Sequence, residues 1–204
     1  MTVEISDEFE APILKEQIDD WKFLRLMAQR CGASLFVVDG EMIFDTVAAK
    51  TSPILKLSLN KNVNNFQKRV SLAHQVGKVE VYGRDVNQKP VKGSASSVSL
   101  GGSGKSAAQW VPGLKEAVLR EYNEFVRTQK ECKSLAQHRL NTIAMGLVSG
   151  SGQCIGIPEL IPGRYLEIEG ADKNANGTYF LSKVRHRFTD DGYTTEFEFK
   201  GAKA

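Results

Sequence analysis

The final third of this chain alternates apolar and polar side chains with a period of two residues, and this pattern constrains the fold more than any other feature of the sequence. Leu and Ile alternate with Glu in residues 166–169, and Phe alternates with Glu in residues 196–199. A period of two predicts strands with one face in an apolar core and the other in water. The side chains expected to face the core are Leu166, Ile168, Val184, Phe188, Phe197 and Phe199.

Turn-forming residues divide the region from residue 146 to residue 200 into four predicted strands. Gly, Pro and Asn interrupt the alternating runs at short intervals, and Asp191-Gly192 provides the turn of a closing hairpin. Short antiparallel strands commonly close into a barrel, because closure leaves no unpaired edge. The predicted fold class is therefore α+β and β-rich, with a small antiparallel β-barrel and inserted helices.

Two segments have the apolar spacing of helices. The first begins near the acidic pair Asp19-Asp20 and ends before Gly32. Its apolar stripe consists of Trp21, Leu24, Ala28 and Cys31. The second begins at residues 128–131, a capping box in which the Thr and Glu side chains each bond a backbone N–H of the other residue. Its apolar stripe consists of Cys132, Leu135, Ala136, Leu140 and Ile143.

The region between the two helices contains further predicted strands. Two apolar runs in residues 33–45 are joined by Asp39-Gly40, a dipeptide typical of a tight hairpin turn. Residues 54–59 and 78–84 alternate as strands do, and a third extended piece lies near Val91. A small antiparallel sheet is therefore expected here.

Three segments lack a clear period. Residues 60–70 are polar without alternation, and residues 116–122 fit either a strand or a short helix. Residues 93–106 are dominated by Gly and Ser, with too little apolar surface to offset the chain entropy lost on ordering. We therefore expect a flexible loop there, and we expect deletion of residues 95–105 to leave folding intact.

These elements predict an organisation in four parts. Residues 1–47 contain an acidic N-terminal segment, a helix and a hairpin, and residues 48–92 contain the first part of the barrel. A Gly/Ser-rich loop follows in residues 93–112, and residues 113–204 contain the second helix and the closing strands. A composition of 41% hydrophobic and 25% charged residues is typical of a globular chain rather than a disordered one.

Gly104-Lys105-Ser106 matches the last three residues of a phosphate-binding loop motif, but the spacing and the flanking segments of that motif are missing. That loop requires Gly where this chain has Ser99, and it requires a strand before it and a helix after it. The flanks are Ser-rich instead, so we expect no nucleotide site and no cofactor.

No catalytic, cofactor-binding or metal-ligating residue can be nominated from the sequence. The three histidines are isolated, and the three cysteines form no C-x-x-C pair, so neither set has the spacing of metal ligands. These residues are His74, His138, His186, Cys31, Cys132 and Cys154.

Two carboxylate pairs, Glu167/Glu169 and Glu196/Glu198, share strand faces and could in principle support acid–base chemistry. Because they alternate with the expected core residues, a solvated outer strand face is the better interpretation. We therefore expect the protein not to be an enzyme.

Charge is distributed unevenly along the chain. Residues 1–20 contain seven Asp and Glu against one Lys, whereas residues 51–93 contain eight Lys and Arg against Glu80 and Asp85. The basic stretch could attract an acidic protein surface or a phosphate backbone. It lacks a recognition helix and an aromatic stacking motif, so we expect no specific nucleic-acid binding.

The N-terminus is acidic and lacks the order of a signal peptide, and no run approaches the roughly 18 apolar residues that span a bilayer. We therefore expect synthesis in the cytoplasm and no stable membrane insertion.

Three segments, taken in order, resemble the baseplate hub family of contractile phage tails and injection systems. That family includes phage late control protein D and the valine-glycine repeat G proteins of type VI secretion. The first segment resembles the family's acid-Trp-x-Phe-Leu helix and apolar hairpin, and it reads IDDWKFLRLMAQRCGASLFVVDGEMIF. The second reads VEVYGRDVNQKPVKG, and the third reads GIPELIPGRYLEIEGADKNANGTYFLSKVRHRFTDDGYTTEFEF.

The resemblance implies a homotrimer whose small barrels form a pseudo-sixfold ring between a hexameric inner tube and a trimeric spike. The implied partners are the inner tube protein, the spike protein and other baseplate proteins, and the implied destination is a phage tail or tail-like particle. In that family another barrel usually precedes the acid-Trp helix, whereas residues 1–17 precede it here. We therefore expect a split, truncated or partial hub.

Two alternatives come from other functional classes. A tail-associated cell-wall hydrolase predicts a cleft that contains a carboxylate of raised pKa. A free-standing β-barrel binding module predicts a monomer.

Overall fold

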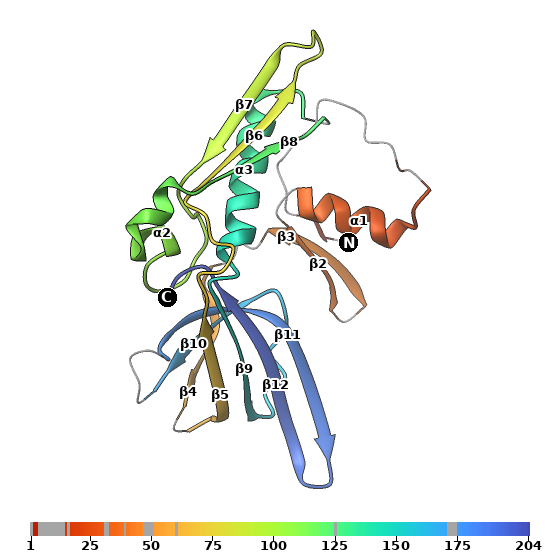
Figure 1. Ribbon diagram of the computed structural model, residues 1–204. Helices are drawn as coiled ribbons and strands as arrows, with labels where there is room; N and C mark the ends of the chain where they lie inside the picture. Colours follow the sequence, from red (N-terminus) through yellow and green to blue (C-terminus); the bar gives the residue numbers. More distant parts are fainter. Residues whose placement is uncertain are drawn as a thin grey trace.

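The computed structural model describes residues 2–3, 15, 17–30, 33–38, 40–46, 51–59, 61–124, 126–170 and 175–204. A curled sheet forms one end of the molecule, a helix-backed sheet forms the other, and an N-terminal helix and hairpin lie at the side (Figure 1). The β-rich α+β class with inserted helices is therefore confirmed.

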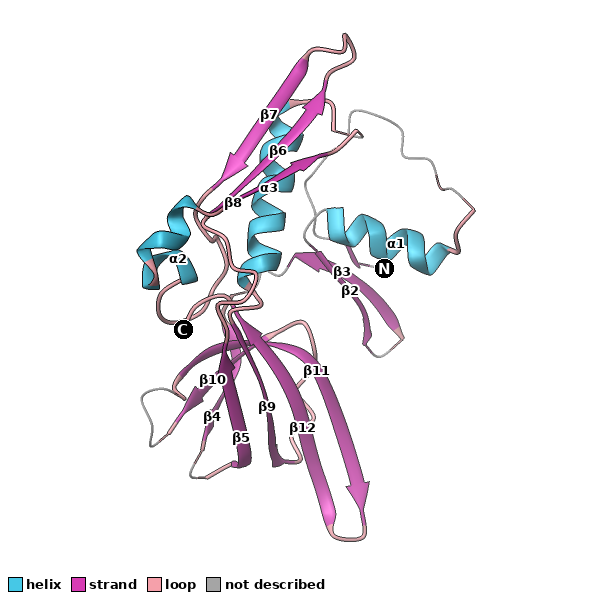
Figure 2. Ribbon diagram, in the orientation of Figure 1, coloured by secondary structure: helices cyan, strands magenta, loops and turns pink. Residues whose placement is uncertain are grey.

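The larger region is a six-stranded sheet with the strand order β4-β10-β11-β12-β9-β5. Its strands are β4 (Pro53–Ser58), β5 (Val63–Val70), β9 (Val148–Ile155), β10 (Tyr165–Glu169), β11 (Gly177–Thr189) and β12 (Gly192–Gly201). The two edge strands, β4 and β5, are consecutive in the chain, and the N–H groups of Lys61 and Asn62 both donate to the Ser58 carbonyl in the turn between them. Because one short turn joins opposite edges, the sheet curls into a half-barrel (Figure 2).

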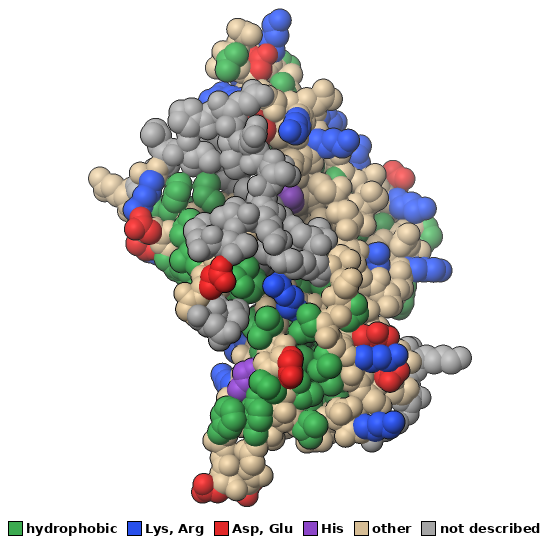
Figure 3. Space-filling view, turned by 180° about the vertical axis from the view of Figure 1, so that it is seen from behind, with side chains coloured by type: hydrophobic (Ala, Val, Ile, Leu, Met, Phe, Trp, Pro, Cys, Tyr) green, Lys and Arg blue, Asp and Glu red, His purple; other side chains and the backbone are tan. Residues whose placement is uncertain are grey.

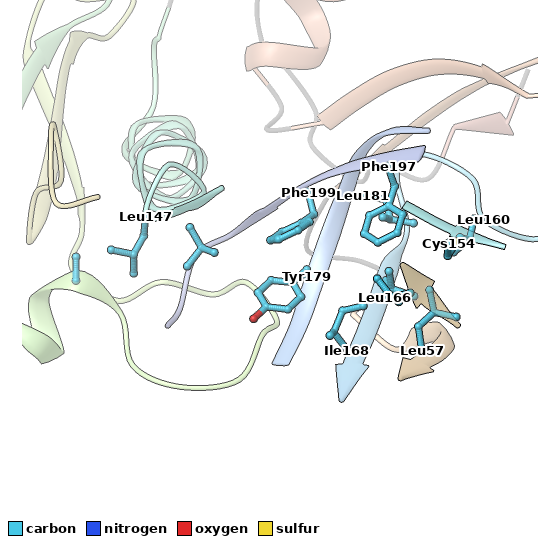
Figure 4. Packing of buried hydrophobic residues seen from close by; sticks show 13 residues of the cluster. Leu57, Leu147, Cys154, Leu160, Leu166, Ile168, Tyr179, Leu181, Phe197 and Phe199 are labelled. Carbon is cyan, nitrogen blue, oxygen red and sulfur yellow. The ribbon is translucent and has the colours of Figure 1, made fainter. Parts of the chain in front are cut away.

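The half-barrel encloses an aromatic-rich core, as the alternation predicts. Phe197 and Phe199 are at most 2% exposed, and Leu166 and Ile168 are at most 1% exposed. Figure 4 shows the Phe197 and Phe199 rings among Leu166, Ile168 and other buried side chains of the sheet. A Cβ on Gly152 would lie 2.4 Å from the Phe197 ring, so glycine at this position of β9 makes room for a ring on β12.

The second region is a three-stranded sheet covered on one face by a helix. Its order is β7-β6-β8, and its elements are β6 (Lys78–Arg84), β7 (Pro90–Ala95), β8 (Val118–Tyr122) and α3 (Gln129–Ala144). α3 begins at the predicted capping box, where the Glu131 N–H donates to Thr128 Oγ1 and the Thr128 N–H donates to the Glu131 carboxylate. Its buried stripe, which includes Ala136, packs against Val79 and Val81. Residues 118–122 are a strand, which decides between the two structures that the sequence allowed.

β5 is a strand where the sequence showed no period. Val63 and Phe66 both pack against the barrel core although they are three residues apart. The register between β5 and β9 shifts between Val63 and Asn65. A bulge adds one residue to a strand, so it breaks the period of two that would have identified this edge strand.

The N-terminal unit contains β1 (Thr2–Val3), α1 (Asp20–Arg30), β2 (Ala33–Val38) and β3 (Glu41–Thr46), with the sheet order β1-β3-β2. The predicted hairpin is present, and Gly40 has a φ of 77°, in the region that favours glycine. Ala28 of the predicted helical stripe is 3% exposed, but Trp21, in the first turn of α1, is 44% exposed. The stripe is therefore buried only toward its C-terminal end, and Cys31 and Asp39 lie outside the described residues.

The Gly/Ser-rich segment is ordered, so the expectation of a flexible loop is wrong. The Asn141 side chain of α3 accepts from the Ser99 N–H at 3.1 Å and donates to Ser99 Oγ at 2.9 Å. Leu100 is 4% exposed. Lys105 and Ala204 exchange two backbone hydrogen bonds of 3.0 Å. Partners far away in the sequence hold the segment, which leads into α2 (Ala107–Trp110) and the 3-10 helix η1 (Pro112–Glu116).

Candidate functional site

The hairpin formed by β11 and β12 projects beyond the end of the half-barrel as a two-stranded ribbon (Figure 1). β10 pairs with β11 only along Gly177–Phe180, and Leu181 then bonds the backbone of residues 163–164. Within the described chain no strand pairs with this edge of β11 from Ser182 to Thr189. The ribbon therefore carries an open strand edge.

Phe188 and Tyr193 form a stacked aromatic pair near the tip of the ribbon. Their ring centroids are 4.2 Å apart, and the rings are inclined by 11°. Phe188 is 75% exposed, so the expectation that it faces a core is wrong. It does lie on the inner face of its strand, paired with Tyr193, but the strand has run past the core at this point. In the view from behind, hydrophobic side chains continue from the half-barrel along the ribbon toward its acidic tip (Figure 3).

His186 connects the base of the ribbon to the loop before β10. Its Nε2 lies 3.1 Å from the Leu160 carbonyl, so Nε2–H donates there. Nδ1 then accepts from the Tyr193 hydroxyl at 2.8 Å. Tyr193 also packs against the backbone at Gly156, where a Cβ would lie 2.0 Å from the ring. These contacts fix the direction in which the ribbon leaves the barrel.

The outer face of the ribbon and of the neighbouring strands carries a ladder of opposite charges. Lys183 Nζ lies 2.9 Å from the Glu198 carboxylate, and Arg187 Nε lies 2.8 Å from that of Glu196. A groove of about 240 Å³ crosses this face. It is lined by Asn65, Ser151, Gly152, Gln153, Lys183, Arg185, Glu196, Phe197 and Glu198. The Glu196/Glu198 pair is therefore engaged by cations on β11.

The second carboxylate pair is engaged in the same way. Lys56 Nζ of β4 lies 2.8 Å from Glu169 Oε2 and 3.5 Å from Glu167 Oε1. Hydrogen bonding to Glu169, together with the nearby charges, raises the pKa of Lys56 above its ordinary value. These contacts fit the outer-face interpretation of the pair.

Glu80 forms a second cluster of charges, on β6, which the sequence did not reveal. Its carboxylate accepts from Lys78 Nζ at 2.7 Å, Lys92 Nζ at 3.1 Å, Arg120 Nε at 3.2 Å and the Tyr82 hydroxyl at 2.8 Å. These donors lie on three different strands. Alternation along β6 places Glu80 on the face opposite Val79 and Val81, but only strand pairing brings the donors together.

The other residues considered from the sequence lie apart. Lys105 pairs through its backbone with Ala204, and Ser106 caps the four-residue α2, so these backbone groups of the Gly-Lys-Ser run are used within the fold. Burial raises the pKa values of the Cys132 and Cys154 thiols, the latter to about 11. His74 is an exposed turn residue with a φ of 62°.

His138 lies on α3, with its Nε2 3.3 Å from Ser134 Oγ. Across the ranges that the structure describes, no three His, Cys, Asp or Glu side chains are grouped to hold a metal ion. No described helix is both long enough and apolar enough to cross a membrane.

Comparison with known proteins identifies a family and a shared fold. Residues 1–190 match the model of a family described as the Alg8 N-terminal domain. No curated protein matches the chain.

Among solved structures, a tail protein from Neisseria meningitidis MC58 has a TM-score of 0.67 and 11% identity, covering 93% of this chain and 57% of that one. The 43 kDa tail protein of prophage MuSo2 from Shewanella oneidensis has a TM-score of 0.64 and 15% identity, with coverages of 99% and 62%. A chain of the native gene transfer agent virion has a TM-score of 0.59 and 11% identity, with coverages of 87% and 38%. The chain thus has the fold of phage tail proteins and spans less than two thirds of their length.

Proposed function

We propose that this chain, which belongs to the Alg8 N-terminal domain family, is a structural subunit of a contractile phage tail or a related injection particle. Within that particle it is the baseplate hub, a homotrimer that joins the inner tube to the spike. The fold shared with tail proteins supports the general role. The ordered resemblance of three sequence segments to the hub family supports the specific one.

The open edge of the β11–β12 ribbon is the observation that carries this proposal. An unpaired strand edge exposes N–H and C=O groups that pair readily with another chain. Phe188, at 75% exposure, supplies an apolar side chain that such a contact would bury. A projecting ribbon with these two properties suits a subunit that works by joining neighbours.

The proposed role is mechanical. The aromatic core and the cross-strand ion pairs of the half-barrel make a stiff body that can hold a spike on one side and a tube on the other. The carboxylate pairs that an acid–base enzyme would use are occupied by Lys56, Lys183 and Arg187. The chain therefore acts through its contacts rather than through a reaction.

We assign the ring-forming barrel to the strands of the half-barrel, in residues 53–70 and 148–201, and the acidic residues 1–47 to contact with an adjoining subunit. The expected barrel segments 48–92 and 113–204 are too wide, because β6, β7, β8 and α3 form the separate helix-backed sheet. The protein is made in the cytoplasm and then enters the particle. Its partners there are the inner tube protein, the spike protein and other baseplate proteins.

Sedimentation velocity over a concentration series tests the role of the ribbon. Phe188→Ser removes the exposed ring, and Val86→Ser is the matched control, because Val86 is 82% exposed in the turn of the other projecting hairpin, β6–β7. We expect the wild type to associate, Phe188→Ser to weaken association at least about tenfold, and Val86→Ser to change it less than about twofold.

Two results would contradict this account. If the wild type sedimented as a single chain at every concentration, the hypothesis of a self-assembling subunit would be wrong, and the free-standing binding module would be favoured. Equal weakening by the two variants would mean that the ribbon is not the joining surface.

A further inference from the structure

The three-stranded sheet has an outer face, opposite α3, that is rich in cations. Val79 and Val81 of β6 point to α3 and are 0% exposed, so the alternating residues Lys78, Glu80 and Tyr82 lie on the other face. Strand pairing adds Lys92 of β7, opposite Tyr82, to this face. It also adds Arg120 and Tyr122 of β8.

The Glu80 carboxylate organises this face. It is 5% exposed, because the side chains that bind it also cover it. Hydrogen bonds from Lys78, then from Tyr82 and Lys92, hold the pKa of Glu80 down at about 2. The carboxylate is therefore ionised in ordinary conditions and fixes three cations within one small area.

The cations outnumber the carboxylate at their centre. Lys78, Lys92 and Arg120 carry three positive charges and share the single negative charge of Glu80. The side chains of Lys92 and Arg120 remain 48% and 64% exposed. An ammonium has three N–H donors and a guanidinium has five, so each keeps donors for a further acceptor. Tyr122, 63% exposed, adds an apolar surface beside them.

We propose that this face is a docking site for an acidic protein segment, which places carboxylates on Lys92 and Arg120 and an apolar side chain on Tyr122. Each cation already holds a carboxylate oxygen at 3.1 to 3.2 Å, so the geometry for this ligand is preformed. A nucleic acid fits less well, because phosphate binding draws its affinity from many neutralised phosphates along a basic stripe. Here Lys78, Lys92 and Arg120 instead gather around one carboxylate.

The chemistry of this docking site does not depend on whether the chain forms a trimeric ring. The inference that the acidic segment belongs to another subunit of the particle, in contrast, rests on the proposed function. The two can therefore fail separately. Peptide binding tests the docking site, and the mass of the purified protein in solution tests whether it forms a trimer.

Fluorescence anisotropy with a labelled deca-glutamate peptide tests the docking site. Lys92→Ala with Arg120→Ala should weaken binding at least about tenfold, because both exposed cations are lost. The matched control is Lys61→Ala with Arg69→Ala, which removes one exposed Lys and one exposed Arg from the half-barrel and should change binding less than about twofold. Binding should also weaken as salt is added.

Glu80→Gln is the most discriminating variant, because the docking site predicts that it binds the peptide more tightly than the wild type does. Removing the internal carboxylate frees three cations for the peptide, so affinity should rise at least about threefold. Circular dichroism confirms that each variant is folded. Weaker peptide binding by folded Glu80→Gln would overturn the proposal, as would equal losses in the two double variants. Tighter binding of a ten-nucleotide single-stranded DNA than of the peptide would overturn it in favour of nucleic acid.

Discussion

The half-barrel and the helix-backed sheet bury their apolar side chains in different ways. The half-barrel core contains packed aromatic side chains. The ring centroids of Phe66 and Phe199 are 5.1 Å apart, and those of Tyr179 and Phe199 are 4.6 Å apart. The core between α3 and its sheet contains no buried aromatic side chain among the described residues. Its buried members are Val79, Val81, Ala95, Val126, Cys132, Ala136 and Leu140.

The distance between backbones explains this contrast. A Cβ on Gly93 of β7 would lie 2.2 Å from the Lys133 backbone nitrogen, so α3 rests directly on the strand and leaves no room for rings. In the half-barrel the strands curl around an open interior, which the rings fill. Close contact therefore selects small side chains, and an enclosed space selects large ones.

The same two regions differ in how they treat charge. On the half-barrel, cations and carboxylates are matched in number: Lys56, Lys183, Arg185 and Arg187 contact Glu167, Glu169, Glu196 and Glu198. On the three-stranded sheet, three cations share Glu80. The half-barrel is thus suited to joining through strand edges and apolar contact, whereas the smaller sheet is suited to joining through charge.

Phe199→Ala is expected to have the largest effect on stability. Its ring is 1% exposed in the barrel core, so truncation should lower the free energy of unfolding by about 3 to 5 kcal/mol. Phe188→Ala, in the same sheet, is the matched control and should lower it by about 1 kcal/mol or less, because only one stacked face is lost. Urea unfolding measures both values. Equal losses would mean that the ribbon packs like the core.

Leu100→Ala tests the junction between the two regions. Leu100 is buried with Ala144 of α3 and with Ala202, just after β12, so the variant should lower the free energy of unfolding by about 2 to 3 kcal/mol. The exposed Ser103→Ala, in the same segment, should change it by less than about 0.5 kcal/mol. Deletion of residues 95–105 should accordingly lower the melting temperature, and thermal unfolding at the wild-type temperature would restore the flexible-loop interpretation.

Thr128→Ala tests the capping box on which α3 depends. The Glu131 N–H loses its acceptor, so the free energy of unfolding should fall by about 1 kcal/mol. Gln129→Ala, at the neighbouring exposed position, should be close to neutral. If denaturant titrations gave the two variants the same midpoint, the cap would not contribute to stability.

Glu80→Gln should show its effect in the pH dependence of stability. The pKa of Glu80 is held down at about 2, against an ordinary value of 4.5. Such a carboxyl stabilises the fold above its unfolded pKa, and the stabilisation is lost as the pH falls through the folded value. The gap between the wild-type and variant urea midpoints should therefore be constant above about pH 5 and shrink below it. A Glu80→Gln gap independent of pH would contradict the assignment.

Sequence reasoning succeeded where one local signal determines one element. Thr128 and Glu131 identified the start of α3, and alternation assigned the faces of β10 and β12. Each of these signals lies within a few residues of the structure that it predicts.

Sequence reasoning failed where distant residues decide the outcome. Phe188 alternates correctly, but alternation cannot tell how far a strand runs past its core. Ser99 and Leu100 are held by residues of α3 and the C-terminal end, which composition does not reveal. The donors that bind Glu80 come together only when the three strands pair in register.

The absolute mass of the purified chain, measured by light scattering over a concentration series, tests the central claim most directly. A self-assembling hub subunit predicts a limiting mass of about three times the 22.5 kDa of one chain, with ring-shaped particles in electron micrographs. A mass equal to one chain at every concentration would contradict it.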